Sequence, residues 1–581
     1  MALVSEPMSG DRMQRWRKRL AAYAPAAGWT TARRLPAGAS FVAGIVALLS
    51  ALGLGSLVVE PSGAVLPIDP SSVNAVDAVA SAVALLALSV GLARGKKLAW
   101  YLAIATFGSA MVLQLVVEGH VIAGSLAGIC LAVLIGDRLR YRARTDGRLI
   151  WPVAIALGLG AALVVAEAVV VGLVTGQAQA ALDALTGWLS FDDPTGLAGT
   201  GGALVIGLLD LATRVLLAVA VLAILRAVAQ RRSDPVERAL ALDVGRRHAT
   251  GALVPFQFGE GTEPFLGPDG NGLVVYGRAG RVTVMLGDPI GPAASAQAAF
   301  EGFVERCVRN DEVPTVYQAS AANRPQLIAA GLRPFKVGQE ATLDLATFSL
   351  DGSRRANLRH TVSRARRGGV DVRWFPYGLP ADEIERCGQA LVEVDRAWQV
   401  GAGPQLGFTI GRFSLDDLAT VALAVAMGPA GEPLAFATFR PTDASGGWVL
   451  DLVRRLPGSV PGALEACIVA AALGLKAADQ TSLSLGLAPL AGLDTRSPDR
   501  TERLLAHTVR LVRRWYDVDG LAFFKQKFDP TWEPRYGAVQ RPWNLPGFAS
   551  ALLRLHLAGP GGSLLVAGRA AVDAAFSAVR R

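Results

Sequence analysis

The stretch that decides the fold of the C-terminal part reads, in order, Gly272-Leu-Val-Val-Tyr276, Val282-Thr-Val-Met-Leu286, a segment of helical length at 294–309, and Pro314-Thr-Val-Tyr317. The three short runs are rich in β-branched and other strand-forming residues. Strands that alternate with helices predict a mixed α/β sheet.

The alternation continues toward the C-terminus, where a second set of elements begins with Val370-Asp-Val-Arg-Trp374. We expect helices at 381–399, 414–426 and 461–478, and strands at 433–440, 447–453 and 481–486. Two successive sets of similar size indicate a duplicated domain. The sequence therefore predicts a first repeat at 235–350, a second repeat at 351–558 and a C-terminal tail at 559–581.

The composition changes upstream of residue 235. Residues 39–230 are dominated by Ala, Val, Leu and Gly, although the chain as a whole is only 52% hydrophobic. Six apolar runs are close to the roughly 20 residues that cross a bilayer; they lie at 40–59, 75–93, 98–117, 119–136, 149–174 and 202–229. We expect a helical membrane domain of six spans behind a basic tail at 1–38, and no cleavable signal peptide.

The charges between these runs predict an orientation. Lys and Arg occur in the N-terminal tail, in Arg94-Gly-Lys-Lys97, and between residues 138 and 148. The alternate loops carry acidic residues and no Lys or Arg. By the positive-inside rule, the N-terminus and everything after residue 230 are cytoplasmic. The expected location is the inner cell membrane, crossed several times.

Three ionisable residues, Glu167, Asp210 and Arg214, fall inside expected spans. Asp210 and Arg214 are four residues apart and therefore share a helix face. Charged groups are costly in lipid and usually face the interior of a helix bundle. They could form a polar path for a lipid headgroup, or a structural ion pair that fixes helix packing.

A basic segment connects the two repeats. The net charge of +9 favours anionic partners, and this segment concentrates it in Arg354, Arg355, Arg359, His360, Arg364, Arg366 and Arg367. It could contact RNA phosphates or lipid headgroups, or it could be a solvated linker helix.

Several kinds of chemistry lack their motifs in this sequence. No Walker sequence, no strand–GxGxxG–helix and no GxSxG is present, which argues against nucleotide or serine-nucleophile chemistry. The four cysteines are isolated and the five histidines are scattered without HExxH. We therefore expect no cofactor, no metal site and no disulfide framework.

Five stretches of the C-terminal part together resemble a known family. They are Gly287-Asp-Pro-Ile-Gly-Pro292, Gly407-Phe-Thr-Ile-Gly-Arg-Phe413, Asp451-Leu-Val-Arg454, Leu483-Ser-Leu-Gly-Leu-Ala-Pro-Leu490, and Phe524-Lys-Gln-Lys-Phe-Asp-Pro-Thr-Trp-Glu-Pro-Arg-Tyr536. Their order and spacing resemble the catalytic domain of the phosphatidylglycerol aminoacyltransferases, also called multiple peptide resistance factors. The resemblance covers about 235–545 and implies a tandem pair of acyltransferase folds of the GNAT type. Well-known members have about fourteen spans, so the six expected here are not a complete lipid flippase.

The resemblance also implies an activity. An aminoacyl group, lysyl or alanyl, would pass from aminoacyl-tRNA to the headgroup hydroxyl of phosphatidylglycerol at the cytoplasmic face of the membrane. The product would reduce the negative charge of the membrane and give resistance to cationic peptides. Two alternatives are a tRNA-dependent ligase acting on a peptidoglycan lipid precursor, and a lipid transporter whose C-terminal domain is not catalytic. A homo-oligomer and a diacylglycerol acceptor also stay open.

The matching motifs supply the candidate site residues. Asp451 would hold the aminoacyl ammonium or take the hydroxyl proton, while Arg454, Lys525 and Lys527 would bind phosphate or stabilise the oxyanion. Arg535 and Tyr536 are further candidates for substrate binding. Without the resemblance, Asp451 and Arg454 could be a plain ion pair, and the two lysines could lie on the wet face of a strand.

One position bears on which amino acid is transferred. Lysine-transferring relatives carry a Glu where this sequence has Gln405. A neutral amide binds a lysyl ammonium more weakly than a carboxylate does. A neutral amino acid such as alanine is therefore an alternative to lysine, although another acid such as Asp395 could substitute.

Overall fold

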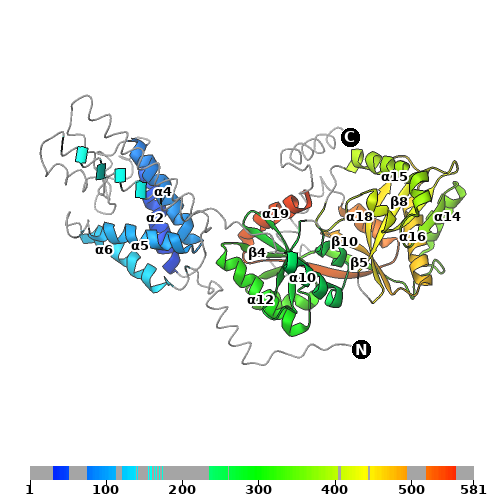
Figure 1. Ribbon diagram of the computed structural model, residues 1–581, viewed down its shortest axis with the longest axis horizontal. Helices are drawn as coiled ribbons and strands as arrows, with labels where there is room; N and C mark the ends of the chain where they lie inside the picture. The colour runs from blue at the N-terminus through cyan, green and yellow to red at the C-terminus, as the bar shows by residue number, and fades with distance from the viewer. Residues whose placement is uncertain are drawn as a thin grey trace. The chain divides into compact units, whose positions relative to one another are not determined.

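The computed structural model describes residues 31–51, 75–112, 121–138 and 235–557, the last with gaps at 260, 403–406, 443–444 and 494–517, and a few single residues at 115, 141 and between 155 and 173. The chain divides into two compact units, one built mainly from residues 8–231 and the other mainly from 232–581. Each is described by itself (Figure 1).

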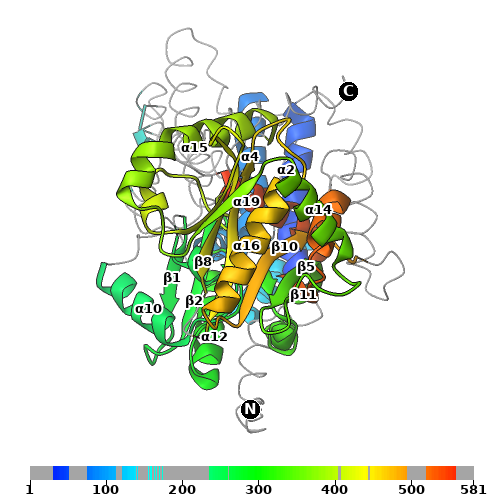
Figure 2. The same ribbon diagram turned by 90° about the vertical axis from the view of Figure 1, so that its right-hand side faces the viewer.

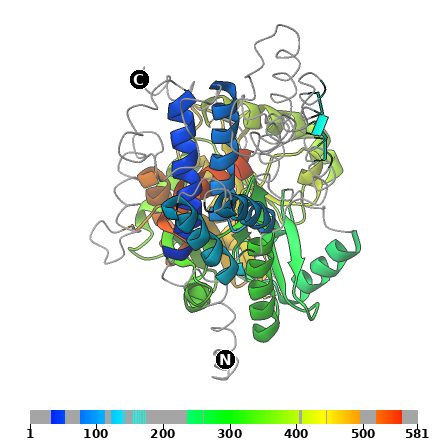
Figure 3. The ribbon, with the colours of Figure 1, turned by 90° about the vertical axis from the view of Figure 1, so that its left-hand side faces the viewer.

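The N-terminal unit is helical in its described residues: α2 (Thr31–Ala51), α4 (Ala75–Ala93), α5 (Lys97–Val112) and α6 (Val121–Gly136). Helices α2 and α4 run side by side (Figure 3), and the Ser89 hydroxyl donates to the Ala37 carbonyl across that interface at 2.8 Å. The Trp100 indole similarly ties α5 to α6 by donating to the Leu134 carbonyl at 2.7 Å. Ser89 and Ala37 are small, which lets α2 and α4 approach closely.

None of the helices within the described ranges combines the length with the apolar composition that a membrane span requires. Helices α5 and α6 have 16 residues each, fewer than the roughly 20 of a span, and α2 carries Arg33 and Arg34 near its start. The described helices thus do not support the prediction of six spans at 39–230. The expected span at 202–229 lies outside the described residues.

The C-terminal unit is built around one sheet of eleven strands. The strands are β1 (Glu263–Leu266), β2 (Leu273–Ala279), β3 (Val282–Leu286), β4 (Val313–Ala319), β5 (Arg333–Asp344), β6 (Asp371–Phe375), β7 (Ala422–Met427), β8 (Pro433–Pro441), β9 (Gly447–Arg455), β10 (Ser482–Pro489) and β11 (Thr531–Val539). The helices are α10 (Pro235–His248), α11 (Val254–Gln257), α12 (Ala293–Arg309), α13 (Arg324–Ala329), α14 (Ala356–Arg367), α15 (Ala381–Ala402), α16 (Ala463–Ala477), α18 (Val518–Gln526) and α19 (Leu545–Leu557).

The strand order shows an internal duplication. It runs β1-β2-β3-β4-β11-β5-β10-β9-β8-β7-β6. In each half an antiparallel ladder leads to one parallel pair, β3 with β4 across α12 and β9 with β10 across α16. The last strands are exchanged, because β5 from the first repeat pairs with β10, and β11 from the second pairs with β4. This order agrees with the tandem acyltransferase fold of the GNAT type that the resemblance implies, joined here into one continuous sheet.

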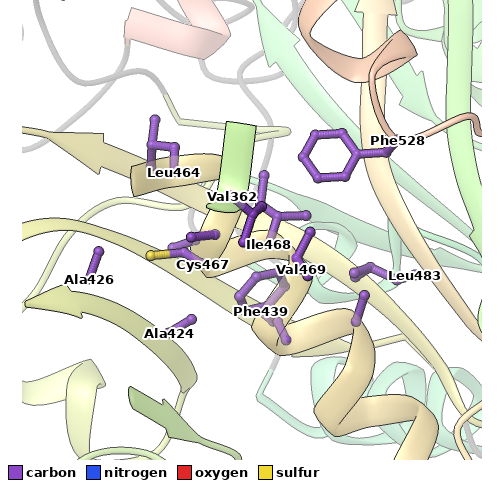
Figure 4. Close-up of a cluster of buried hydrophobic side chains, with 14 of the residues drawn as sticks. Val362, Ala424, Ala426, Phe439, Leu464, Cys467, Ile468, Val469, Leu483 and Phe528 are labelled. Carbon is purple, nitrogen blue, oxygen red and sulfur yellow. The ribbon is translucent and has the colours of Figure 1, made fainter. Parts of the chain in front are cut away.

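Helices cover both faces of the second repeat's sheet (Figure 2). On one face, α14 and α16 pack on the largest buried cluster, where Phe439, Ile468 and Leu483 meet from a strand, a helix and another strand (Figure 4). On the opposite face, Leu391 and Val394 of α15 pack on Phe436 and its neighbours. This opposite face, which we call the α15 face, carries most of the candidate site.

One local prediction was wrong, and one alternative interpretation does not hold. The segment expected to form a helix at 414–426 contains a short 3-10 turn at Asp416–Ala419 and then strand β7. Its run of Ala, Leu and Val suits a helix locally, but every residue of β7 is buried between two strands and helices, so tertiary packing overrides propensity. The alternation around Lys525 is not a strand either, because Lys525 belongs to α18.

Candidate active site

A β-bulge on β9 places the first two candidate residues. Leu452 pairs with Thr438 and Leu450 with Phe439, so Asp451 is an extra residue opposite β8. Residues three apart on a regular strand point to opposite faces. The bulge corrects this offset, and both Asp451 and Arg454 contact side chains on the α15 face.

The Asp451 carboxylate is buried, and only one of its two oxygens has a hydrogen-bond partner among the described residues. Its Oδ2 accepts from Arg440 Nε at 2.8 Å and from the Thr438 hydroxyl at 3.4 Å. Arg440 is held in turn by Asp417 at 3.4 Å. Asp451 Oδ1 is buried and has no hydrogen-bond partner among the described residues. A buried acceptor without a partner is costly, so this oxygen keeps an unused capacity to accept a hydrogen bond.

Gly411 lies directly against this oxygen. A Cβ at residue 411 would stand 2.0 Å from Asp451 Oδ1. Only glycine can therefore occupy this position without moving the carboxylate, which explains a glycine inside the motif Gly407–Phe413.

Arg454 does not pair with Asp451. Its Nε donates to Asp395 Oδ1 on α15, and Gln399 one turn later donates to the other carboxylate oxygen. The side chains of Arg454 and Asp395 are 11% and 6% exposed. Arg454 thus forms a buried ion pair that joins β9 to α15 beside Asp451, and its predicted role in phosphate or oxyanion binding stays a prediction.

Strands β9 and β10 separate next to Asp451. They pair only from Gly447 to Val449 with Ser482 to Ser484. Continuing this parallel register places Gly486 opposite Asp451. The β10 backbone is irregular here, with a register shift against β5 between Ser484 and Leu487.

The Lys525 side chain binds the backbone of β10 at the point where the two strands separate. Its Nζ donates to the carbonyls of Gly486 and Leu487 at 3.0 and 2.7 Å. Burial lowers the pKa of Lys525 from its ordinary value of 10.5 to about 7, against the opposing effect of the Glu340 carboxylate. When the amine is neutral, its two N–H groups can donate to these two carbonyls and its lone pair is left unused. Lys525 can therefore accept a proton near neutral pH.

A buried polar row crosses the three central strands beside Lys525. Glu340 on β5 accepts from the Ser484 hydroxyl on β10 at 2.6 Å and from Arg535 Nη2 on β11 at 2.6 Å. Arg535 is therefore paired inside the sheet. Tyr536 follows it, with the Arg324 guanidinium 4.7 Å from its ring centre.

The remaining candidates lie elsewhere. Lys527 pairs with Glu465 of α16 at 2.9 Å, on the face opposite Asp451. Gln405, Glu167, Asp210 and Arg214 lie outside the described residues.

The basic segment forms α14 and the turn before it. Arg355 donates to the Phe528 carbonyl at 3.0 Å and Arg359 to the Leu350 carbonyl at 2.6 Å, so these two arginines are structural. The other basic residues are exposed: Arg354, His360, Arg364, Arg366 and Arg367.

This arrangement suits acyl transfer. Where two parallel strands part, one strand carries a buried carboxylate oxygen without a described partner, and the carbonyls of the other bind a lysine of lowered pKa. The carboxylate can bind an ammonium group and the amine can take a hydroxyl proton. Both groups are buried, which strengthens their electrostatic interactions.

Sequence reasoning missed three residues of this site: Arg440, Glu340 and Gly411. Glu340 had a signal, because it is a carboxylate in the interior of the β-rich run of β5. Gly411 had one too, as a glycine inside a quoted motif. Arg440 ends an expected strand and gave no indication that it would pair with Asp451.

Comparisons with known proteins show what this domain is similar to. Residues 253–539 match the family described as "Phosphatidylglycerol lysyltransferase, C-terminal". The chain is 30% identical over 278 residues to a phosphatidylglycerol lysyltransferase of Bacillus subtilis, covering 48% of this chain and 32% of that protein. It is 29% identical over 304 residues to the lysylphosphatidylglycerol biosynthesis bifunctional protein LysX of Mycolicibacterium vanbaalenii, covering 49% and 26%.

The chain therefore spans about a third or less of the length of these curated relatives. Among solved structures, a crystallised C-terminal domain (DUF2156) from Agrobacterium fabrum aligns at 26% identity with a TM-score of 0.49, covering 57% of this chain and 100% of that one.

Proposed function

We propose that the chain transfers an aminoacyl group from aminoacyl-tRNA to a hydroxyl of phosphatidylglycerol, proceeding from the premise that residues 253–539 form an aminoacyl-phosphatidylglycerol synthase catalytic domain. The carrying observation is the Oδ1 of Asp451 on β9, which has no described partner, together with Lys525 on the carbonyls of β10, where the pairing of these two strands ends. The names of the relatives support phosphatidylglycerol as acceptor.

In this proposal Asp451 Oδ1 binds the α-ammonium of the aminoacyl group, which every amino acid carries. The headgroup hydroxyl attacks the ester carbonyl and gives its proton to neutral Lys525. The tetrahedral intermediate then collapses: the bond from the acyl carbon to the tRNA ribose oxygen breaks, and that oxygen receives the proton from Lys525. One ester is exchanged for another, so no cofactor is needed.

Lysine is the favoured aminoacyl group, because the relatives are named lysyltransferases. Gln405 keeps alanine as an alternative. Offering purified lysyl-tRNA and alanyl-tRNA separately to the full chain tests this choice. Use of alanyl-tRNA at an equal rate would contradict a lysine preference.

The membrane location is part of the proposal and is supported by the apolar runs and their charge pattern in 39–230. A substrate that resides in the inner membrane fits a catalytic domain on the cytoplasmic side. The product would lower the negative surface charge and thereby weaken the binding of cationic peptides. A tag at residue 145 should be protected in intact cells and a tag at 190 accessible; the reverse result would contradict this orientation.

The test of the activity uses the full chain in phosphatidylglycerol vesicles with labelled aminoacyl-tRNA. The expected product is an aminoacyl phospholipid, identified by mass spectrometry of the headgroup. Vesicles with diacylglycerol, or with a peptidoglycan lipid precursor, distinguish the other acceptors. Labelling of either one, with none of phosphatidylglycerol, would overturn the proposal.

A further inference from the structure

The segment Gly407–Phe413 makes a strained turn before it reaches Asp451. The Thr409 amide donates to the Gly407 carbonyl at 2.8 Å, and Phe408 between them has φ +67°. This is a three-residue turn in a conformation that a non-glycine residue rarely adopts. Such a turn persists only where its surroundings hold it.

Phe408 is held by the core of the first repeat. Its side chain is buried with Val284, Leu286 and Phe335. A Cβ on residue 277 of β2 would approach the Phe408 ring to 2.7 Å, so a glycine is required there. The turn that precedes Gly411 is thus anchored outside the repeat that contains Asp451.

His556 near the end of α19 binds both residues that flank Phe408. Its carbonyl accepts from the Gly407 amide at 2.7 Å. Its Nε2 lies 2.9 Å from the Thr409 hydroxyl, and its ring meets the Phe408 ring edge-on at 5.5 Å.

The protonation state of His556 follows from its partners. Nδ1 lies 2.8 Å from the Leu552 carbonyl, which can only accept, so Nδ1 carries the proton. Burial lowers the pKa of His556, which keeps the ring neutral. Nε2 is then an acceptor, and the Thr409 hydroxyl donates to it.

We propose that His556 and Thr409 form a latch that fixes the turn at Phe408 and thereby holds Gly411 against Asp451. His556 is in this sense a positioning residue for the acyl-transfer site, an inference that rests on the proposed function. Loosening the latch would let Gly411 move away from Asp451 and would change the surroundings of Oδ1. The ammonium group of the substrate would then be less well positioned.

Three single substitutions in the full chain and one double variant test the latch. His556→Phe keeps a buried ring but removes the acceptor, and Thr409→Val removes the donor at nearly equal volume. Each should lower kcat by about 10- to 100-fold, as a displacement of about 1 Å does, with little change in KM for phosphatidylglycerol. The double variant should lose no more than either single variant, because both remove one hydrogen bond. His556→Gln, whose amide oxygen can accept from Thr409, should recover much of the rate.

The control is Thr361→Val on α14, whose hydroxyl donates to the Asn357 carbonyl at 2.9 Å, away from the latch. It should keep the wild-type rate. Wild-type kcat in Thr409→Val or His556→Phe, or additive losses in the double variant, would overturn the latch.

Hydrogen exchange separates this inference from the proposed function. The amides of Gly407 and Thr409 should exchange faster in Thr409→Val and in His556→Phe than in wild type, and should be unchanged in Thr361→Val. If wild type forms no aminoacyl lipid, the proposed function fails, yet this exchange pattern still reports the latch. Unchanged exchange in the latch variants would overturn it.

Discussion

The two parallel strand pairs of the sheet have the same topology but differ in length. In the first repeat, β3 and β4 pair over all five residues of β3, from Val282 to Leu286. In the second, β9 and β10 pair over three and then separate. The first pair stays hydrogen-bonded along the whole of β3, whereas the second stops pairing two residues before Asp451.

Their buried polar groups differ in the same way. Between β3 and β4, the Thr315 hydroxyl donates to the Thr283 carbonyl at 3.2 Å, and both residues are satisfied inside the sheet. Beside β9 and β10, Asp451 Oδ1 has no partner among the described residues and Lys525 has a pKa of about 7. Duplication thus supplied two similar scaffolds, and the reactive groups lie where regular pairing ends.

The largest expected effect is that of Asp451→Asn, which keeps the side-chain volume but removes the charge. If Asp451 binds the ammonium, the rate of aminoacyl-lipid formation should fall about 10²- to 10³-fold, as for loss of one transition-state partner. The matched control is Thr315→Val in the closed pair, which should leave the rate near wild type. Equal losses of rate in Asp451→Asn and Thr315→Val would contradict the assignment of the site to the second repeat alone.

Asp395→Asn should mainly affect stability. It leaves Arg454 buried without a counter-charge, and breaking a buried pair from one side costs about 3 kcal/mol. Denaturant unfolding of the full chain should show this loss. The variant Arg373→Gln removes an ion pair with Glu383 that is 44% exposed on its arginine side and should change stability much less. A small loss in Asp395→Asn would show that Arg454 finds another partner.

Gly411→Ala should lower activity by about 10- to 100-fold, because the new methyl group must displace Asp451 or the segment itself. Gly547→Ala is a suitable control, since the nearest atom to its Cβ would be at 3.6 Å. Activity of Gly411→Ala equal to that of this control would mean that the contact with Asp451 is not needed.

The smallest effect concerns pH and Lys525. Folding lowers the pKa of this lysine from 10.5 to about 7, so between these values the unfolded chain binds more protons and stability contributed by this site rises with pH. Below pH 7 both states are protonated, and the cost of burying the charge is constant. The Tm of the wild type should therefore rise relative to the Tm of Lys525→Met as the pH increases from 7 to 10. A gap that stays constant over this range would contradict the lowered pKa.

The sequence predicted the composition of this site better than its contacts. The motifs contained Asp451, Arg454, Lys525 and Arg535, and the alternation of strands and helices indicated the tandem α/β fold. Asp451 and Arg454 were open to interpretation as an ion pair, but the structure gives them Arg440 and Asp395 as partners. Arg440 lies on β8 and Asp395 on α15. No local sequence pattern predicts a contact between side chains so far apart in the sequence.

The sequence did not predict the β9 bulge either. The bulge places the side chains of residues 451 and 454 on the same face of the sheet. The sequence Asp451-Leu-Val-Arg454, however, predicts an ordinary strand. Strand β7 was predicted as a helix for a related reason, since its Ala-rich sequence becomes a strand only through the neighbours that bury it.

The most direct test of the difference between the repeats is to locate the bound substrate. A photoreactive aminoacyl-tRNA analogue with an amide in place of the ester cannot be turned over, and it can be cross-linked to the full chain in phosphatidylglycerol vesicles. The aminoacyl end should label residues 451–454 and 486–487 beside the separated strands. That label should be lost in Asp451→Asn. Labelling of β3 and β4 instead, unchanged in Asp451→Asn, would contradict this position of the acyl-transfer site.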